Sequence, residues 1–142
     1  MHSLMDLQEA FHNLNWLAII VAALSAFVLG GLWYSPLLFA KRWMKETGIT
    51  EESTKNANMI KIFFLAFILA LIASFFLAML IGARAGAGFG ALDGFLAGLG
   101  LVFTFMGISY LFESRTLMHF VINSVYSIVS LTIMGLIIGV IQ

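Results

Sequence analysis

The stretch SYLFESRTLMHFVINSVY, residues 109–126, joins two apolar runs through a short charged turn. Glu113 and Arg115 mark the turn, and apolar residues dominate again from Leu117 to Ile141. About 20 apolar residues in an α-helix are enough to cross a hydrocarbon core of about 30 Å. The stretch therefore predicts a tight turn between two transmembrane helices.

The composition of the whole chain agrees with this interpretation. Hydrophobic residues make up 62% of the 142 residues and charged residues only 10%, whereas soluble domains have about 45–50% and about 25%. So much apolar surface needs lipid around it. We therefore expect an all-α, polytopic membrane protein, a single domain over residues 1–142 built as a bundle of four transmembrane helices in the lipid bilayer. The apolar runs cover about residues 15–39, 61–81, 91–112 and 117–141.

The N-terminal segment, residues 1–14, has apolar residues at helical spacing: Leu4, Leu7, Phe11 and Leu14. This pattern is typical of a short amphipathic helix at the outer membrane face. It is equally typical of a frayed start of the first span, and both interpretations stay open. No Lys or Arg precedes the first run, which is also too long for a cleavable signal core, so we expect it to stay in the protein.

Basic residues are distributed unequally between the predicted loops. The loops after the first and third spans share one side of the membrane and hold Lys41, Arg42, Lys45, Lys55, Lys61 and Arg115, while the other side has only Arg84. Because cytoplasmic loops carry the excess of Lys and Arg, this predicts both termini outside the cytoplasm of a bacterial inner membrane.

The basic loop also contains signals for helix ends. Gly48 suits the left-handed position after a helix, and Thr50 suits an N-cap. We expect the second helix to begin near Glu51 and to enter the bilayer near Lys61.

Glycines recur every four residues before and within the third span. Gly90, Gly94 and Gly98 predict a face that packs closely against another helix. Gly82, Gly86 and Gly88 predict a flexible turn. Asp93 lies among these glycines, and it is interpreted either as a carboxylate at a helix start or as part of an ion site.

The end of the first run, Trp33, Tyr34, Ser35 and Pro36, is a candidate kink and interface. Pro36 cannot donate a backbone hydrogen bond, so the helix should loosen there. The aromatic residues fit an interfacial belt, and the freed carbonyl with Ser35 and Tyr34 could instead form a polar notch.

The fourth run carries one polar stripe. At about 100° per residue, its polar members fall within an arc of about 80°; they are Thr116, His119, Asn123, Tyr126 and Ser130. Such a stripe should face other helices or water and not lipid. The candidate polar site comprises Glu113, Arg115, His119, Asn123 and Tyr126.

Common enzyme chemistry finds no support in the sequence. There is no cysteine, no pair of histidines at metal-ligand spacing, no phosphate-binding loop and no nucleophile elbow. We expect no enzyme activity, no cofactor, no metal and no nucleic acid partner.

Three segments resemble a family of bacterial integral membrane proteins known as domain of unknown function 1761. They are NWLAIIVAALSAFVLGGLWYSPLLFAKRWM, YLFESR and INSVYSIVSLTIMGLIIG, residues 15–44, 110–115 and 122–139. The most distinctive positions are Trp33, Tyr34, Pro36, Trp43, Glu113, Asn123 and Tyr126. The resemblance implies a small four-helix membrane protein without an assigned activity. In that family we expect Asn before the YLFE run, where this chain has Ser109.

Two functions remain open. In the first, the stripe lines a cavity or weak pathway for protons or a small polar solute, with Glu113 and Arg115 at its cytoplasmic mouth. In the second, the stripe belongs to a structural or accessory protein and holds helices or subunits together. Because four helices offer few neighbours for a polar stripe, we also expect a homo-oligomer, most simply a dimer.

Overall fold

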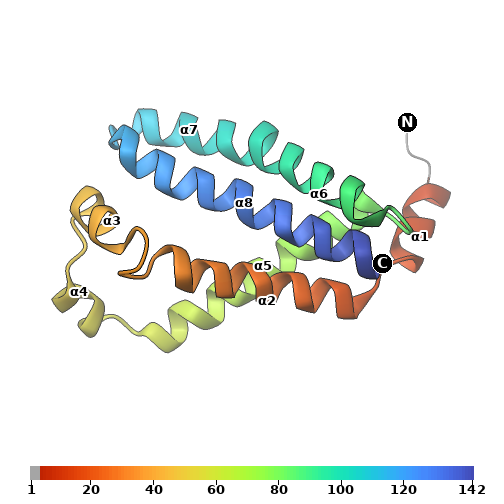
Figure 1. Cartoon of the computed structure of the whole chain (residues 1–142), viewed down its shortest axis with the longest axis horizontal. Coiled ribbons are helices and arrows are strands. Elements are labelled where there is room, and N and C mark those ends of the chain that lie inside the picture. The colour runs from red at the N-terminus through yellow and green to blue at the C-terminus, as the bar shows by residue number, and fades with distance from the viewer. Residues whose placement is uncertain (1–3) are drawn as a thin grey trace.

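A computed structural model describes residues 4–142, with side chains from Asp6 onward. Four helical segments are long and apolar enough to cross a membrane: α2 (Trp16–Trp33), α5 (Met59–Ile81), the segment Gly86–Phe112 and α8 (Leu117–Ile141). The described residues contain no strand. The prediction of an all-α protein with four such helices is confirmed. The helix α1 (Leu4–His12) and the C-terminus lie at one end of the bundle, with α3 (Ala40–Thr47) and α4 (Glu51–Asn56) at the other (Figure 1).

The last helix, α8, is the centre of the bundle, because it packs against α2, α5 and the whole third segment. Small residues of α2 allow a close approach, since Ala18, Ala22 and Ala26 repeat at four-residue steps and are all buried. They join a core with Ile19, Leu77, Ala78, Met134 and Ile138.

The third segment consists of α6 (Gly86–Ala97), a π-helical turn η1 (Gly98–Val102) and α7 (Phe103–Phe112). Its glycines meet the backbone of α8. A methyl group added at Gly94 would fall on the Leu131 carbonyl oxygen, and one at Gly90 on the Gly135 carbonyl oxygen. At Gly98 it would lie 2.9 Å from the Ile128 Cα. The predicted close-packed glycine face is confirmed.

The connection between α5 and α6 is shorter than we expected, because α6 begins at Gly86 and not near residue 91. Gly82 and Gly86 both have positive φ, which agrees with a turn, but Gly88 lies inside α6. The interpretation of Asp93 as a carboxylate at a helix start is therefore wrong, since Asp93 lies two turns into α6.

The first span ends earlier than predicted. α2 stops at Trp33, and residues 34–39 form turns before α3, so the chain leaves the helix before Pro36 instead of kinking at it. The physical reason is that the proline ring disfavours helical geometry in the residue before it.

The loop beyond α3 follows most of the predicted end signals. Gly48 is left-handed with φ 78°, and the Thr50 side chain accepts from the Ser53 amide at the start of α4. The second span does not begin at Glu51, however. The chain is extended at Ala57, and Asn58 caps a new helix by accepting from the Lys61 amide, so α4 and α5 are separate.

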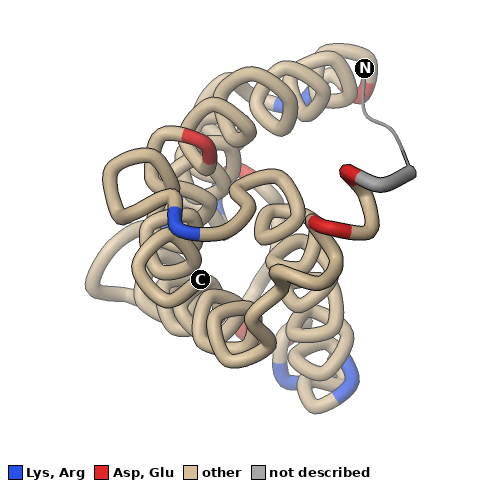
Figure 2. Tube along the Cα trace, turned by 90° about the vertical axis from the view of Figure 1, so that its right-hand side faces the viewer, with Lys and Arg blue, Asp and Glu red and all other residues tan. Residues whose placement is uncertain are grey.

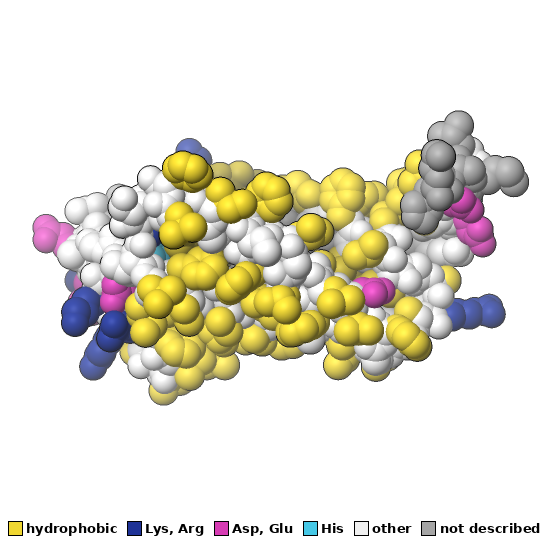
Figure 3. Space-filling view, turned by 90° about the horizontal axis from the view of Figure 1, so that it is seen from above, with side chains coloured by type: hydrophobic (Ala, Val, Ile, Leu, Met, Phe, Trp, Pro, Cys, Tyr) yellow, Lys and Arg dark blue, Asp and Glu magenta, His cyan; other side chains and the backbone are white. Residues whose placement is uncertain are grey.

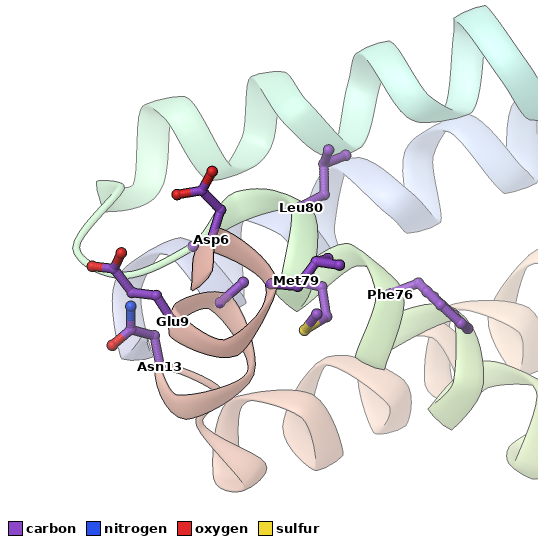
Figure 4. Close-up of a pocket in the computed structure, with 9 residues that line it drawn as sticks. Asp6, Glu9, Asn13, Phe76, Met79 and Leu80 are labelled. Atoms are coloured by element: carbon purple, nitrogen blue, oxygen red, sulfur yellow. The ribbon is translucent and has the colours of Figure 1, made fainter. Parts of the chain in front are cut away.

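The helix α1 is separate from α2 and packs beside the C-terminal part of α5. Phe11 contacts Phe75 edge-on, with ring centroids 6.2 Å apart. Between α1 and α5 lies a cavity of about 680 Å³, with Asp6, Glu9 and Asn13 on α1 and Phe76, Met79 and Leu80 on α5 (Figure 4). The side chain of Leu4, part of the predicted apolar face, lies outside the described side chains.

The surface separates into a hydrophobic middle and charged ends. Hydrophobic side chains cover the middle of the molecule, and Lys and Arg side chains project mainly from the end that carries α3 and α4 (Figure 3). Along the chain trace, charged residues are sparse (Figure 2). This distribution matches a protein that crosses a bilayer.

Candidate functional site

The Asn123 side chain joins three helical segments. Its Oδ1 accepts a hydrogen bond from the Tyr34 hydroxyl at 2.7 Å, and its Nδ2 donates to the Tyr110 hydroxyl at 2.8 Å. Tyr34 follows α2, Tyr110 belongs to α7 and Asn123 to α8. The amide therefore uses its oxygen and its nitrogen to hold α2 and α7 to the central helix.

Two more bonds tie α2 to α8 beside this amide. The Tyr126 hydroxyl donates to the Ala26 carbonyl at 2.7 Å, and the Trp33 indole donates to the Ile122 carbonyl at 3.0 Å. The rings of Tyr34 and Tyr126 lie 5.4 Å apart. We call Trp33, Tyr34, Tyr110, Asn123 and Tyr126 the polar lock.

The π-helical turn brings Tyr110 into the lock. In a regular α-helix, residue 109 would point within about 20° of the direction of Gly98, and residue 110 about 120° away from it. The extra residue in η1 shifts this register by one. Accordingly Ser109 is exposed and Tyr110 is half-buried against α8. Ser109 thus lies outside the polar lock.

A second polar contact connects α3 with the start of α8. The Thr116 hydroxyl donates to Glu46 Oε2 at 2.6 Å, and Arg42 pairs with Glu46 Oε1 at 2.9 Å. The hydrogen bond from Thr116 lowers the pKa of the Glu46 carboxyl; burial opposes this, and Arg42 adds to the lowering. Glu46 is therefore ionised at neutral pH and balances the charge of Arg42.

The predicted charges at the α7–α8 turn pair with each other. Arg115 bonds Glu113 at 2.8 Å, and its guanidinium carbon lies 5.3 Å from the centre of the Tyr110 ring. Arg115, Tyr110 and Thr116 line a cavity of about 310 Å³ whose other walls come from Gly107, Leu111, Leu117 and Phe120. Both charged side chains are exposed, so this ion pair lies on the surface at the end of the bundle.

Two polar groups near the lock have no partner among the described residues. His119 is only 4% exposed and packs edge-on against Tyr110 at 5.0 Å, and neither of its ring nitrogens makes a hydrogen bond there. The buried Trp43 indole nitrogen of α3 is likewise unbonded, although its ring contacts Tyr34. Along the chain, Trp43 lies between Tyr34 and Glu46, and His119 lies between Thr116 and Asn123.

The structure divides the predicted stripe into two parts. Asn123 and Tyr126 make interhelical bonds, and the buried Ser130 hydroxyl lies 3.9 Å from the sulfur of Met134. The His119 ring makes no hydrogen bond among the described residues, although its backbone amide donates to the Thr116 hydroxyl. The Ser35 hydroxyl makes only local bonds, donating to the Leu32 carbonyl and accepting from the Leu37 amide, and Pro36 is exposed, so neither belongs to the polar lock.

Sequence reasoning missed two partners of the stripe. Tyr110 had no predicted role beyond the resemblance, because its direction depends on the π-helical turn. Glu46 had no predicted role. A signal did exist for Glu46, since it is the only acidic residue between Lys41 and Thr50 and so is a natural partner for a neighbouring base.

Comparison with known proteins assigns a family. The sequence pattern of a family described as "Protein of unknown function (DUF1761)" matches residues 17–139. The chain belongs to this family. The matched DUF1761 region contains all five residues of the polar lock and ends only three residues before the C-terminus. No curated protein and no solved structure shows a significant match to the chain. Membership therefore brings no assigned activity or ligand to these residues.

Proposed function

We propose that this DUF1761 protein is a non-enzymatic accessory protein of the membrane, in which the polar stripe of α8 holds the bundle together. The observation that supports this role is the pair of hydrogen bonds between the Asn123 amide and tyrosines from two other segments. Tyr126 and Trp33 use their polar atoms in the same way. Polar groups satisfied between helices stabilise a bundle in lipid and leave few atoms for a passing solute.

In an accessory protein of this kind, the lipid-facing surface of the bundle makes the functional contacts. Large apolar side chains such as Phe64, Leu101 and Phe105 are more than 60% exposed, which suits contact with lipid or with other transmembrane helices. Self-association into a homodimer stays a prediction from the sequence.

A second candidate function is the binding of a proton or a small polar molecule next to His119. Two observations favour it: the Trp43 indole nitrogen is buried without a partner, and the ring of His119, a residue only 4% exposed, makes no hydrogen bond among the described residues. A buried donor without a partner costs about 1–3 kcal/mol, so a water or a solute that accepts this hydrogen bond would be stabilised.

We also propose that the α3–α4 end faces the cytoplasm of a bacterial inner membrane. Lys41, Arg42, Lys45 and Lys55 belong to that end, whereas Arg84 lies in the α5–α6 turn at the other. This arrangement follows the positive-inside bias and leaves both termini outside.

Single cysteines can test the sidedness and the closed stripe together, because the natural chain has none. We expect a membrane-impermeant thiol reagent to label Ala83→Cys in intact cells and Lys55→Cys only after permeabilisation. Ser130→Cys, whose parent serine is 5% exposed, should stay unlabelled from either side because no water reaches it.

Two of these positions test different parts of the proposal. Labelling of Lys55→Cys in intact cells would reverse the proposed orientation. Rapid labelling of Ser130→Cys in folded protein would mean that water follows the stripe past Asn123, and the accessory role would then give way to a pathway.

A further inference from the structure

One carboxylate lies inside the apolar belt. Near Asp93, Gly94 packs against Leu131, and Gly90 packs against Gly135. Gln142 marks the end of the bundle, because its side chain bonds Asn15, Ala78 and Gly82. Asp93 is thus level with residues 131–135 of α8, about seven to eleven residues or roughly 10–17 Å below that end.

Asp93 is half-buried, and its carboxylate has no ion pair or hydrogen bond among the described side chains. Ionisable side chains at such depth usually pair with another group or face water, because lipid solvates a charge poorly. No described group of this bundle supplies that pairing. The carboxylate is therefore free to serve a contact outside the bundle.

The described spans have no Lys or Arg to offer at this depth. The only basic residue of α5 is Lys61, at the opposite end of the bundle, and α2, α6 and α7 contain no Lys or Arg. His119 is buried near that same opposite end. A second copy in the same orientation would have the same shortage, so charge complementarity points to a different protein.

We propose that the α6 surface around Asp93 binds a transmembrane helix of another protein that carries a basic side chain at matching depth. This inference rests on the accessory role proposed above and names the class of partner. Ala97, one turn from Asp93, is small and lets a helix approach closely, while Phe89 and Leu96 are 69% and 54% exposed and provide apolar contact.

The test uses the full-length protein in phosphatidylcholine vesicles with synthetic leucine-rich transmembrane peptides as probes. One peptide carries a single Arg eight residues from its outer end, and its match carries Leu there. Energy transfer between labels on protein and peptide measures association. We expect the Arg peptide to bind about tenfold more tightly than the Leu peptide, because it neutralises the carboxylate in lipid.

Two variants make the result specific. Asp93→Asn keeps the size of the side chain and should reduce the Arg preference to less than about twofold. Glu9→Gln removes an exposed carboxylate of α1 and should keep the full preference. Helical content and thermal midpoint establish that both variants are folded.

Equal binding of the two peptides by the wild-type protein would overturn the inference. Asp93-dependent energy transfer between two labelled copies of the protein would overturn it as well and would assign the surface to a second copy. The accessory role fails by a different result, water or solute passing along the stripe, which leaves the peptide preference unaffected. The two proposals can therefore fail separately.

Discussion

Replacing Gly94 by alanine should destabilise the bundle by about 3 kcal/mol or more, at the upper end of the usual range for overpacked interiors. The added methyl group would fall on the carbonyl oxygen of Leu131, which is backbone and cannot rotate away. α6 and α8 would have to move apart, which would weaken the most extensive contact of the central helix. The measurement is the midpoint of thermal unfolding in detergent micelles, followed by circular dichroism.

Other glycines give a graded control. Gly98→Ala should cost less, because its new contact is a 2.9 Å approach to Ile128, and Gly107→Ala less again, since it meets only the movable end of the Phe120 ring at 3.3 Å. Gly88→Ala meets nothing and should gain about 0.5–1 kcal/mol from helix propensity. Equal midpoints for Gly94→Ala and Gly88→Ala would contradict the close contact of α6 and α8.

Replacing Asn123 by leucine should lower the stability by about 2–3 kcal/mol, because it leaves the Tyr34 and Tyr110 hydroxyls without their partner. Tyr34→Phe and Tyr110→Phe each remove one hydrogen bond and should cost about 0.6–1.5 kcal/mol. The expected coupling is strong: once Asn123 is leucine, Tyr34→Phe should have almost no further effect. A double-mutant cycle of unfolding free energies measures this coupling.

Ser127→Ala is the matched control for that cycle. The Ser127 hydroxyl bonds only the Asn123 carbonyl of its own helix, so its loss should change stability by less than about 0.5 kcal/mol. If Tyr34→Phe and Asn123→Leu had additive effects, the bond between them would not hold α2 to α8.

Much of the fold follows from the sequence because transmembrane helices have simple requirements. Long apolar runs must form helices, since the lipid offers no partner for the backbone. The glycine face at Gly90, Gly94 and Gly98 was also predictable, because two helix backbones can approach closely only where the residues between them have very small side chains or none. The break between α4 and α5 was less accessible, because it depends on the competition between two possible N-caps, Thr50 and Asn58.

Only the α8 residues of the site were predictable from the sequence. The angular arithmetic of α8 placed His119, Asn123 and Tyr126 on one stripe, but it says nothing of which helices face that stripe. Tyr110 reaches Asn123 only because η1 contains an extra residue, and nothing in the local letters GLGLV signals a π-helical turn. Tyr34 reaches it because the chain leaves the helix before Pro36. The first is a departure from regular helical geometry, and the second is a local steric effect of the proline ring.

The central claim is that the stripe of α8 holds helices together and does not conduct. Flux into vesicles containing the purified protein tests it most directly, with a pH dye for protons and light scattering for urea and glycerol. We predict rates equal to those of protein-free vesicles and unchanged in the His119→Ala, Asn123→Ala double variant. Protein-dependent flux that the double variant abolishes would contradict the claim and establish the pathway.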